Sequence, residues 1–139
     1  MKEAKDRIKE KMEEVEKLLA ELDTIVPSSF EVYLEDYKSR AACERYAERI
    51  IEGIVDVAYL LVREKKLESP EDDSHVFALL AEASLISLAL SKKLREAKGM
   101  RNVLAHEYGS VDDHIVFSAL GGELQQDSAL FIQLVRDQL

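Results

Sequence analysis

The chain has little of what irregular, disulfide-linked or membrane-bound proteins need. It contains 5 Gly, 2 Pro and a single Cys among 139 residues. So few helix-breaking residues argue against a disordered chain, and one cysteine excludes an internal disulfide. The longest apolar stretch, residues 76–91, is interrupted by Glu82, and the first residues do not resemble a signal peptide. We therefore expect a cytoplasmic protein with no membrane partner.

Positive charge is also scarce. There are 19 Lys and Arg against 28 Asp and Glu, which gives a formal net charge of -9. This balance argues against a surface that binds nucleic acid everywhere, because non-specific affinity for phosphate comes from clustered Lys and Arg. One cluster exists within ten residues, made of Lys92, Lys93, Arg95, Lys98 and Arg101. It indicates either a local approach for RNA or an ordinary solvated helix face, and the acidic remainder suits a basic partner.

What the chain does contain is apolar residues at helical spacing. Apolar residues make up 47% of the chain and charged residues 34%, as is typical of soluble helical proteins. The length fits one domain, residues 1–139, that can bury a core without a metal or a disulfide. About five helical segments are expected: the residues before Pro27, residues 30–65, 76–83 and 84–98, and a last segment from residue 111 to the C-terminus. We predict an all-α helical bundle.

Residues 30–65 are expected to form the central helix. Two adjacent apolar stripes run along them, a face too wide for one neighbour to cover. We therefore expect this helix to pack inside its own subunit and also against a second subunit. Gly53 lies in its middle and costs about 1 kcal/mol relative to Ala, so we expect it at the dimer seam, where two backbones approach closely. In the last segment, Gly121 and Gly122 predict a kink or a break.

The most informative stretch is residues 99–109, which contain Arg101, Asn102, His106 and Tyr108. Roughly 0.006 matches to Arg-x4-His-x-Tyr are expected by chance at this composition, so the pattern is not accidental. Arg is a permanent cation that holds phosphate, and His moves protons near neutral pH. The stretch therefore predicts an RNA-cutting site.

Helical geometry constrains how this site can work. Arg101 and His106 are five residues apart, which places them roughly 140° apart around a straight helix. Either the helix ends near Ala105 and a turn brings His106 back, or the working groups are assembled with the matching residues of a second subunit. Metal-free RNA cleavage needs one group to take the proton of the 2′-hydroxyl and another to protonate the leaving 5′-oxygen. A two-fold axis would supply two motif histidines.

The pattern Arg101-Asn102-x3-His106-x-Tyr108 resembles the signature of the HEPN superfamily, and in particular of the HepT toxins. Residues 37–44, followed by a long apolar helix, are similar to the second helix of that family. The resemblance implies a helical bundle that forms a homodimer with the active cleft at the subunit interface. It also implies a metal-independent endoribonuclease that needs no cofactor, paired with an MNT-type nucleotidyltransferase antitoxin in a type VII toxin–antitoxin system. In that family the antitoxin transfers AMP to the motif tyrosine, here Tyr108.

Two motif residues would perform the chemistry. Arg101 would bind the scissile phosphate and stabilise the extra charge of the pentacoordinate state. Its alternative is a helix-end ion pair with Glu96 or Glu107. His106 would be the general base or acid, and its alternative is a solvated or core-bonded histidine.

The other two motif residues would support them. Asn102 would orient Arg101 or the phosphate, or it could cap a turn. Tyr108 would carry the modification, or it is only a packing aromatic. Outside the motif, we expect Cys43 to be a core thiol, His75 and His114 to be surface residues, and Arg40 and Glu44 to form a salt bridge or, as a second interpretation, to line the cleft. No metal site is expected, since Asp72-Asp73 and Asp112-Asp113 suit helix starts.

A second class of function remains open at this point. The acidic surface also suits a non-catalytic helical module that docks a minimal nucleotidyltransferase and completes its substrate site. A purely structural scaffold is disfavoured by the low chance expectation of the motif. Cleavage of RNA by the purified chain, dependent on Arg101 and His106, separates the first two interpretations.

Overall fold

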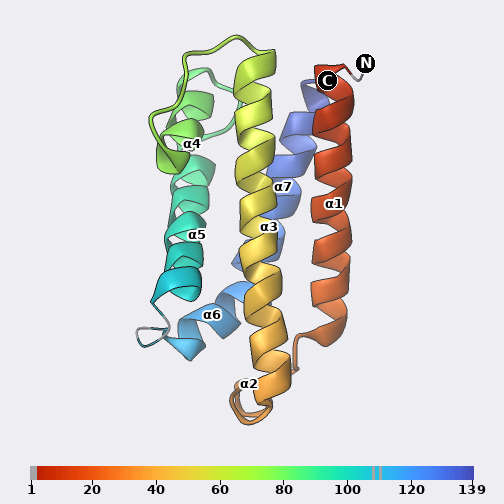
Figure 1. Cartoon of the computed structure of the whole chain (residues 1–139), viewed down its shortest axis with the longest axis vertical. Helices are drawn as coiled ribbons and strands as arrows, with labels where there is room; N and C mark the ends of the chain where they lie inside the picture. Colours follow the sequence, from red (N-terminus) through yellow and green to blue (C-terminus); the bar gives the residue numbers. More distant parts are fainter. Residues whose placement is uncertain (1–2, 108, 110) are drawn as a thin grey trace.

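The computed structural model describes residues 3–107, 109 and 111–139, and that part of the chain contains helices but no strand. The helices are α1 (Ala4–Ile25), α2 (Phe30–Glu35), α3 (Tyr37–Glu64), α4 (Asp73–Glu82), α5 (Leu88–His106), α6 (Asp113–Leu120) and α7 (Glu123–Asp137). Figure 1 shows α1, α3, α5 and α7 standing side by side, with α6 lying across their lower end and both termini at the upper end. The predicted all-α bundle is confirmed.

Two predicted segments are each divided into two helices. Residues 30–65 are interrupted at Asp36, whose carboxylate accepts hydrogen bonds from the backbone and the hydroxyl of Ser39. This side chain competes with the helical hydrogen-bond ladder and starts α3 as an N-cap. The last segment breaks at Gly121 and Gly122, as predicted, because glycine has low helix propensity.

The core is organised around α3. Its buried residues come from both apolar stripes, and α3 contacts α1, α4, α5, α7, α2 and α6 of the same chain. The broad apolar face is therefore covered within one chain and does not by itself require a second subunit, so packing of α3 against a second subunit stays a prediction. The coverage has a geometric reason, since a central helix in a bundle is surrounded by several neighbours.

Gly53 lies at a close contact within its own chain. A Cβ atom built on Gly53 would lie 2.5 Å from Cγ2 of Val15 on α1. The glycine therefore allows α1 and α3 of one chain to approach closely, and its presence is explained without a second subunit. Val15 is completely buried at this contact.

No helix in the described part of the chain is long and apolar enough to span a bilayer.

Candidate functional site

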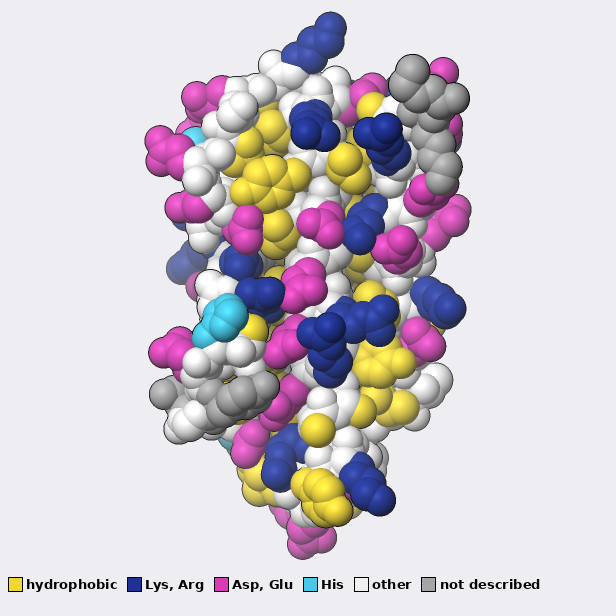
Figure 2. Space-filling view, in the orientation of Figure 1, with side chains coloured by type: hydrophobic (Ala, Val, Ile, Leu, Met, Phe, Trp, Pro, Cys, Tyr) yellow, Lys and Arg dark blue, Asp and Glu magenta, His cyan; other side chains and the backbone are white. Residues whose placement is uncertain are grey.

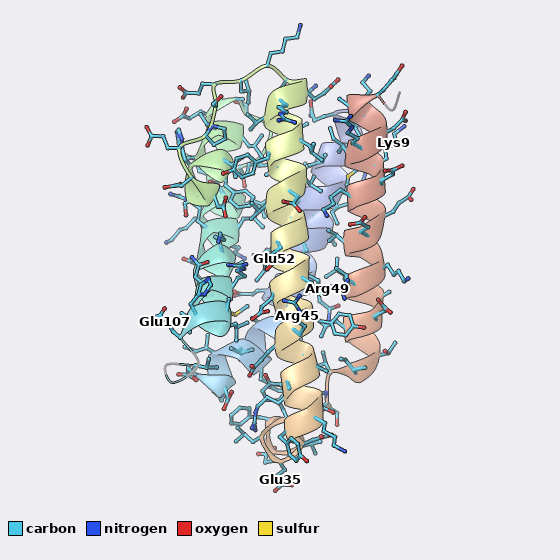
Figure 3. The ribbon with its side chains drawn as sticks, viewed as in Figure 1. Lys9, Glu35, Arg45, Arg49, Glu52 and Glu107 are labelled. Carbon is cyan, nitrogen blue, oxygen red and sulfur yellow. The ribbon has the colours of Figure 1, made fainter. Side chains whose placement is uncertain are left out.

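The motif lies on the last two turns of α5 and just beyond them. Ser87 caps the start of α5 by accepting a hydrogen bond from the Leu90 backbone N–H, and the helix continues through His106. Glu107, labelled at the lower end of α5 in Figure 3, is its C-cap. Tyr108 falls outside the described residues, so its predicted role is taken up below only as a proposal.

Arg101 is held by a carboxylate from the central helix. Its Nη2 and Nε atoms both donate to Oε1 of Glu52, at 2.6 and 3.2 Å. The Arg101 side chain is 22% exposed and the Glu52 side chain 41% exposed, so the pair lies at the edge of the solvent. The alternative considered from the sequence, an ion pair with Glu96 or Glu107, is not the one formed. Glu52 was not predicted as a partner of Arg101, although it is a charged residue that interrupts the apolar run of residues 50–55.

Asn102 continues the network on the outer side of α5. Its Oδ1 accepts from Nη1 of Arg101 at 3.3 Å and from Nζ of Lys98 at 2.8 Å. Lys98 also pairs with Asp73 of α4 at 3.2 Å, and Asp73 accepts from the hydroxyl of Tyr59 at 2.9 Å. Burial and the bond to Asp73 raise the pKa of Tyr59 to about 12, which keeps the phenol a donor. Asn102 thus lies where it can orient Arg101.

His106 is the last residue of α5 and is exposed. Among the described residues it has no hydrogen-bond or ion-pair partner. Because α5 includes His106, the helix does not end near Ala105, and ideal helical geometry places Arg101 and His106 roughly 140° apart around its axis. Within the described part of one chain, no hydrogen bond joins the side chains of Arg101 and His106.

The cationic cluster on α5 is largely neutralised by acids from other helices. Besides the Arg101 and Lys98 pairs, Lys93 lies 3.8 Å from Asp127 of α7. Figure 2 shows Asp and Glu side chains interspersed with Lys and Arg over the visible face. Three of the five cations in the cluster, Lys93, Lys98 and Arg101, are therefore paired with carboxylates from other helices.

Arg40 and Glu44 do not form the expected salt bridge. Arg40 Nη1 donates to the carbonyl of Leu34, and no ion pair joins it to Glu44 within the described structure. Burial raises the pKa of Glu44, and the nearby carboxylate of Asp113 raises it further, while Arg40 acts in the opposite direction. Both predicted residues line a hollow of about 420 Å³ with Tyr37, Ala41, Val111 and Asp113. One of its lining residues, Val111, follows His106 by five residues in the sequence.

Three other residues singled out from the sequence, Cys43, His75 and His114, make packing or hydrogen-bond contacts away from the motif. Cys43 is buried, and burial raises the pKa of its thiol to about 11, as expected for a core thiol. His75 accepts a hydrogen bond from the backbone of Glu71 at 3.0 Å, and the ring of His114 packs edge-on against Phe30.

Both Asp pairs begin helices, with Asp72 and Asp112 as the N-caps of α4 and α6. Within the described ranges, no three His, Cys, Asp or Glu side chains are grouped closely enough to hold a metal ion.

Fold and site together define an all-helical protein with an Arg–His motif on one helix, and solved structures share this fold. A tri-AMPylated HEPN toxin of Shewanella oneidensis, solved in complex with an MNT antitoxin, superposes with a TM-score of 0.88 at 22% identity, covering 99% of each chain. This similarity shows the HEPN toxin fold.

Sequence comparison gives the family. The model described as ribonuclease HepT-like matches residues 8–134. A tRNA nuclease HepT of Aphanizomenon flos-aquae is 25% identical over 86% of this chain and 81% of its own length. A candidate RNase of Archaeoglobus fulgidus is 30% identical over 97% of this chain and 95% of its own length. The chain belongs to the ribonuclease HepT-like family.

Proposed function

We propose that this chain is a metal-independent endoribonuclease, the toxin of a toxin–antitoxin pair, in which Arg101 holds the scissile phosphate and His106 transfers protons. The observation that carries the proposal is the motif itself, placed on α5 of a HepT-like bundle with Arg101 held by Glu52 and Asn102. A relative of this chain is named as a tRNA nuclease, which supports RNA as the substrate class.

The chemistry needs two proton carriers, and the described part of one chain presents only His106 near Arg101 in sequence. A homodimer would supply the second histidine. In such a cleft one imidazole would take the proton from the 2′-hydroxyl, which attacks the adjacent phosphorus, and the other would protonate the departing 5′-oxygen. The products would be a 2′,3′-cyclic phosphate and a free 5′-hydroxyl. Arg101 would stabilise the negative charge of the pentacoordinate state.

The partner would be an MNT-type nucleotidyltransferase antitoxin that transfers AMP to Tyr108. Support comes from the AMPylated HEPN toxin that shares this fold and was solved with such an antitoxin. An AMP group two residues beyond His106 would add a negative charge and a purine near the incoming RNA. Like-charge repulsion and occupied space would both oppose binding of an RNA phosphate.

The test is cleavage of a single-stranded RNA by the purified chain in the presence of EDTA. We expect products with cyclic phosphate ends, and we expect Arg101→Ala and His106→Ala to lose cleavage while keeping the helical circular dichroism spectrum. His75→Ala is the matched control, because His75 only accepts a backbone hydrogen bond at the start of α4. Cleavage that survives in His106→Ala would reject the assignment. A wild-type chain that leaves RNA intact but binds the nucleotidyltransferase would favour the non-catalytic docking module instead.

A further inference from the structure

The carboxylate of Glu52 makes a charge-assisted contact with Arg101 of the motif, and the proposed chemistry gives this carboxylate no proton-transfer role. It comes from the middle of α3, 49 residues away from Arg101 in the sequence. Figure 3 shows Glu52 on α3 above Arg49 and Arg45 of the same helix. We propose that Glu52 is a positioning residue of the ribonuclease site, which fixes the guanidinium of Arg101 so that its free edge receives the phosphate. This inference rests on the proposed ribonuclease function.

The bonding pattern of Arg101 carries the argument. A guanidinium has five N–H donors in a rigid planar fork. Glu52 Oε1 takes one from Nε and one from Nη2, and Asn102 Oδ1 takes one from Nη1. One N–H therefore remains on each terminal nitrogen. These two donors remain available to the oxygens of a phosphate.

The fork is restrained from two directions. Glu52 holds its inner edge from α3, whereas Asn102 is itself held by Lys98, and Lys98 by Asp73 of α4. An unrestrained Arg side chain has many rotamers, and the restraint removes that freedom before RNA binds. Catalytic geometry is sensitive to such pre-organisation, because small displacements of a positioned group cost large factors in rate.

The charge of Glu52 has a second and opposite effect. The pair with Arg101 is formally neutral, so the carboxylate reduces the attraction of this site for an RNA phosphate. A residue kept only for RNA affinity would not be negative. Removing the charge should therefore strengthen RNA binding, which lowers KM. It should also loosen the Arg101 side chain, which lowers kcat. A merely structural ion pair would not produce this split.

The experiment measures kcat and KM for RNA cleavage with wild type, Glu52→Gln and Glu52→Ala. Glu52→Gln keeps an oxygen acceptor at the same place without the charge, so we expect it to retain more activity than Glu52→Ala. We expect kcat to fall roughly 10- to 100-fold in Glu52→Ala, with KM unchanged or lower in both variants. Thermal unfolding of each variant shows whether the helices remain folded.

The matched control is Asp56→Asn. Asp56 lies one turn further along α3 and forms a cross-helix ion pair with Lys11 at 3.3 Å, with no contact to Arg101. The Asp56→Asn substitution removes one negative charge from the same helix, and we expect its kcat to stay at the wild-type value.

Equal loss of kcat in Asp56→Asn and Glu52→Gln, or wild-type kinetics in Glu52→Ala, would overturn the positioning role while Arg101→Ala in the same assay still reports on the ribonuclease. A wild-type chain without cleavage would overturn both.

Discussion

Arg101 and His106 lie five residues apart on one continuous helix, α5, and ideal helical geometry places them roughly 140° apart around its axis. Arg101 turns toward α3 and pairs with Glu52, whereas His106 is exposed at the helix end. An angular separation of this size favours a histidine from a second subunit acting on the phosphate held by Arg101. This relationship is the main structural reason to propose a cleft shared by two subunits.

Gly53→Ala should destabilise the folded subunit. The added Cβ would lie 2.5 Å from Cγ2 of Val15, so α1 and α3 must separate or the valine must move. We expect a loss of about 1–3 kcal/mol in the free energy of unfolding, as for other overpacked cores. Chemical denaturation measures it, and Val15→Ala in the same chain should recover part of the loss by removing the clashing methyl group.

Gly99→Ala is the control for that substitution. Gly99 is a helical glycine on α5 where a Cβ would meet nothing within 4 Å. Alanine should therefore stabilise the subunit there by up to about 1 kcal/mol through helix propensity. An unchanged stability of Gly53→Ala would contradict the close approach of α1 and α3.

Glu44→Gln should stabilise the protein at neutral pH and not in acid. Burial and the carboxylate of Asp113 raise the pKa of Glu44, so the folded state binds this proton more readily than the unfolded state. The positive charge of Arg40 lowers the pKa of Glu44, whereas the negative charge of Glu48 raises it. Stability therefore falls as the pH rises from the ordinary range of a glutamate through the raised pKa of Glu44.

The measurement is the melting temperature of both proteins from pH 4 to pH 8. The variant should exceed wild type at pH 8, and the difference should shrink as the pH falls. Glu68→Gln is the control substitution, because Glu68 is exposed after the end of α3. A difference in melting temperature that is constant with pH would contradict a raised pKa of Glu44 in the folded state.

Tyr108 should be the residue that a cognate nucleotidyltransferase modifies. Incubation of the chain with that enzyme and ATP should add one or more AMP units to the peptide containing Tyr108 and stop RNA cleavage. Tyr108→Phe should remain unmodified and active. Tyr37→Phe is the control, because Tyr37 is 66% exposed and offers a competing hydroxyl. An adduct mapped to Tyr37, or a fully active modified enzyme, would contradict this form of control.

The helical architecture followed from the sequence because the apolar spacing and the capping residues are local signals. Gly121 and Gly122 predicted the break between α6 and α7 because glycine is also a local signal. The break at Asp36 was missed because one capping side chain interrupts an otherwise continuous apolar pattern. Gly53 was correctly linked to a close approach of backbones, but the sequence does not say which backbone approaches, and the prediction named a second subunit where the structure shows α1.

The site was predictable to the extent that its chemistry lies in one short stretch. Arg101, Asn102 and His106 are within six residues, so the motif can be recognised from the sequence alone. The partners that orient it, Glu52 on α3 and Asp73 on α4, come from distant segments and depend on how the helices pack. Periodicity fixes which face a residue occupies on its own helix, but not what that face meets.

Mixing of subunits tests most directly whether one cleft uses both motif histidines. Wild-type and His106→Ala chains are co-refolded in equal amounts, so that dimers assort at random, and RNA cleavage is compared with that of wild type at the same total concentration. If each cleft needs two His106 side chains, only dimers of two wild-type chains are active, and about one quarter of the activity remains. Activity that falls only to about one half, in proportion to the wild-type chain, would show that each subunit works alone and would contradict the shared cleft.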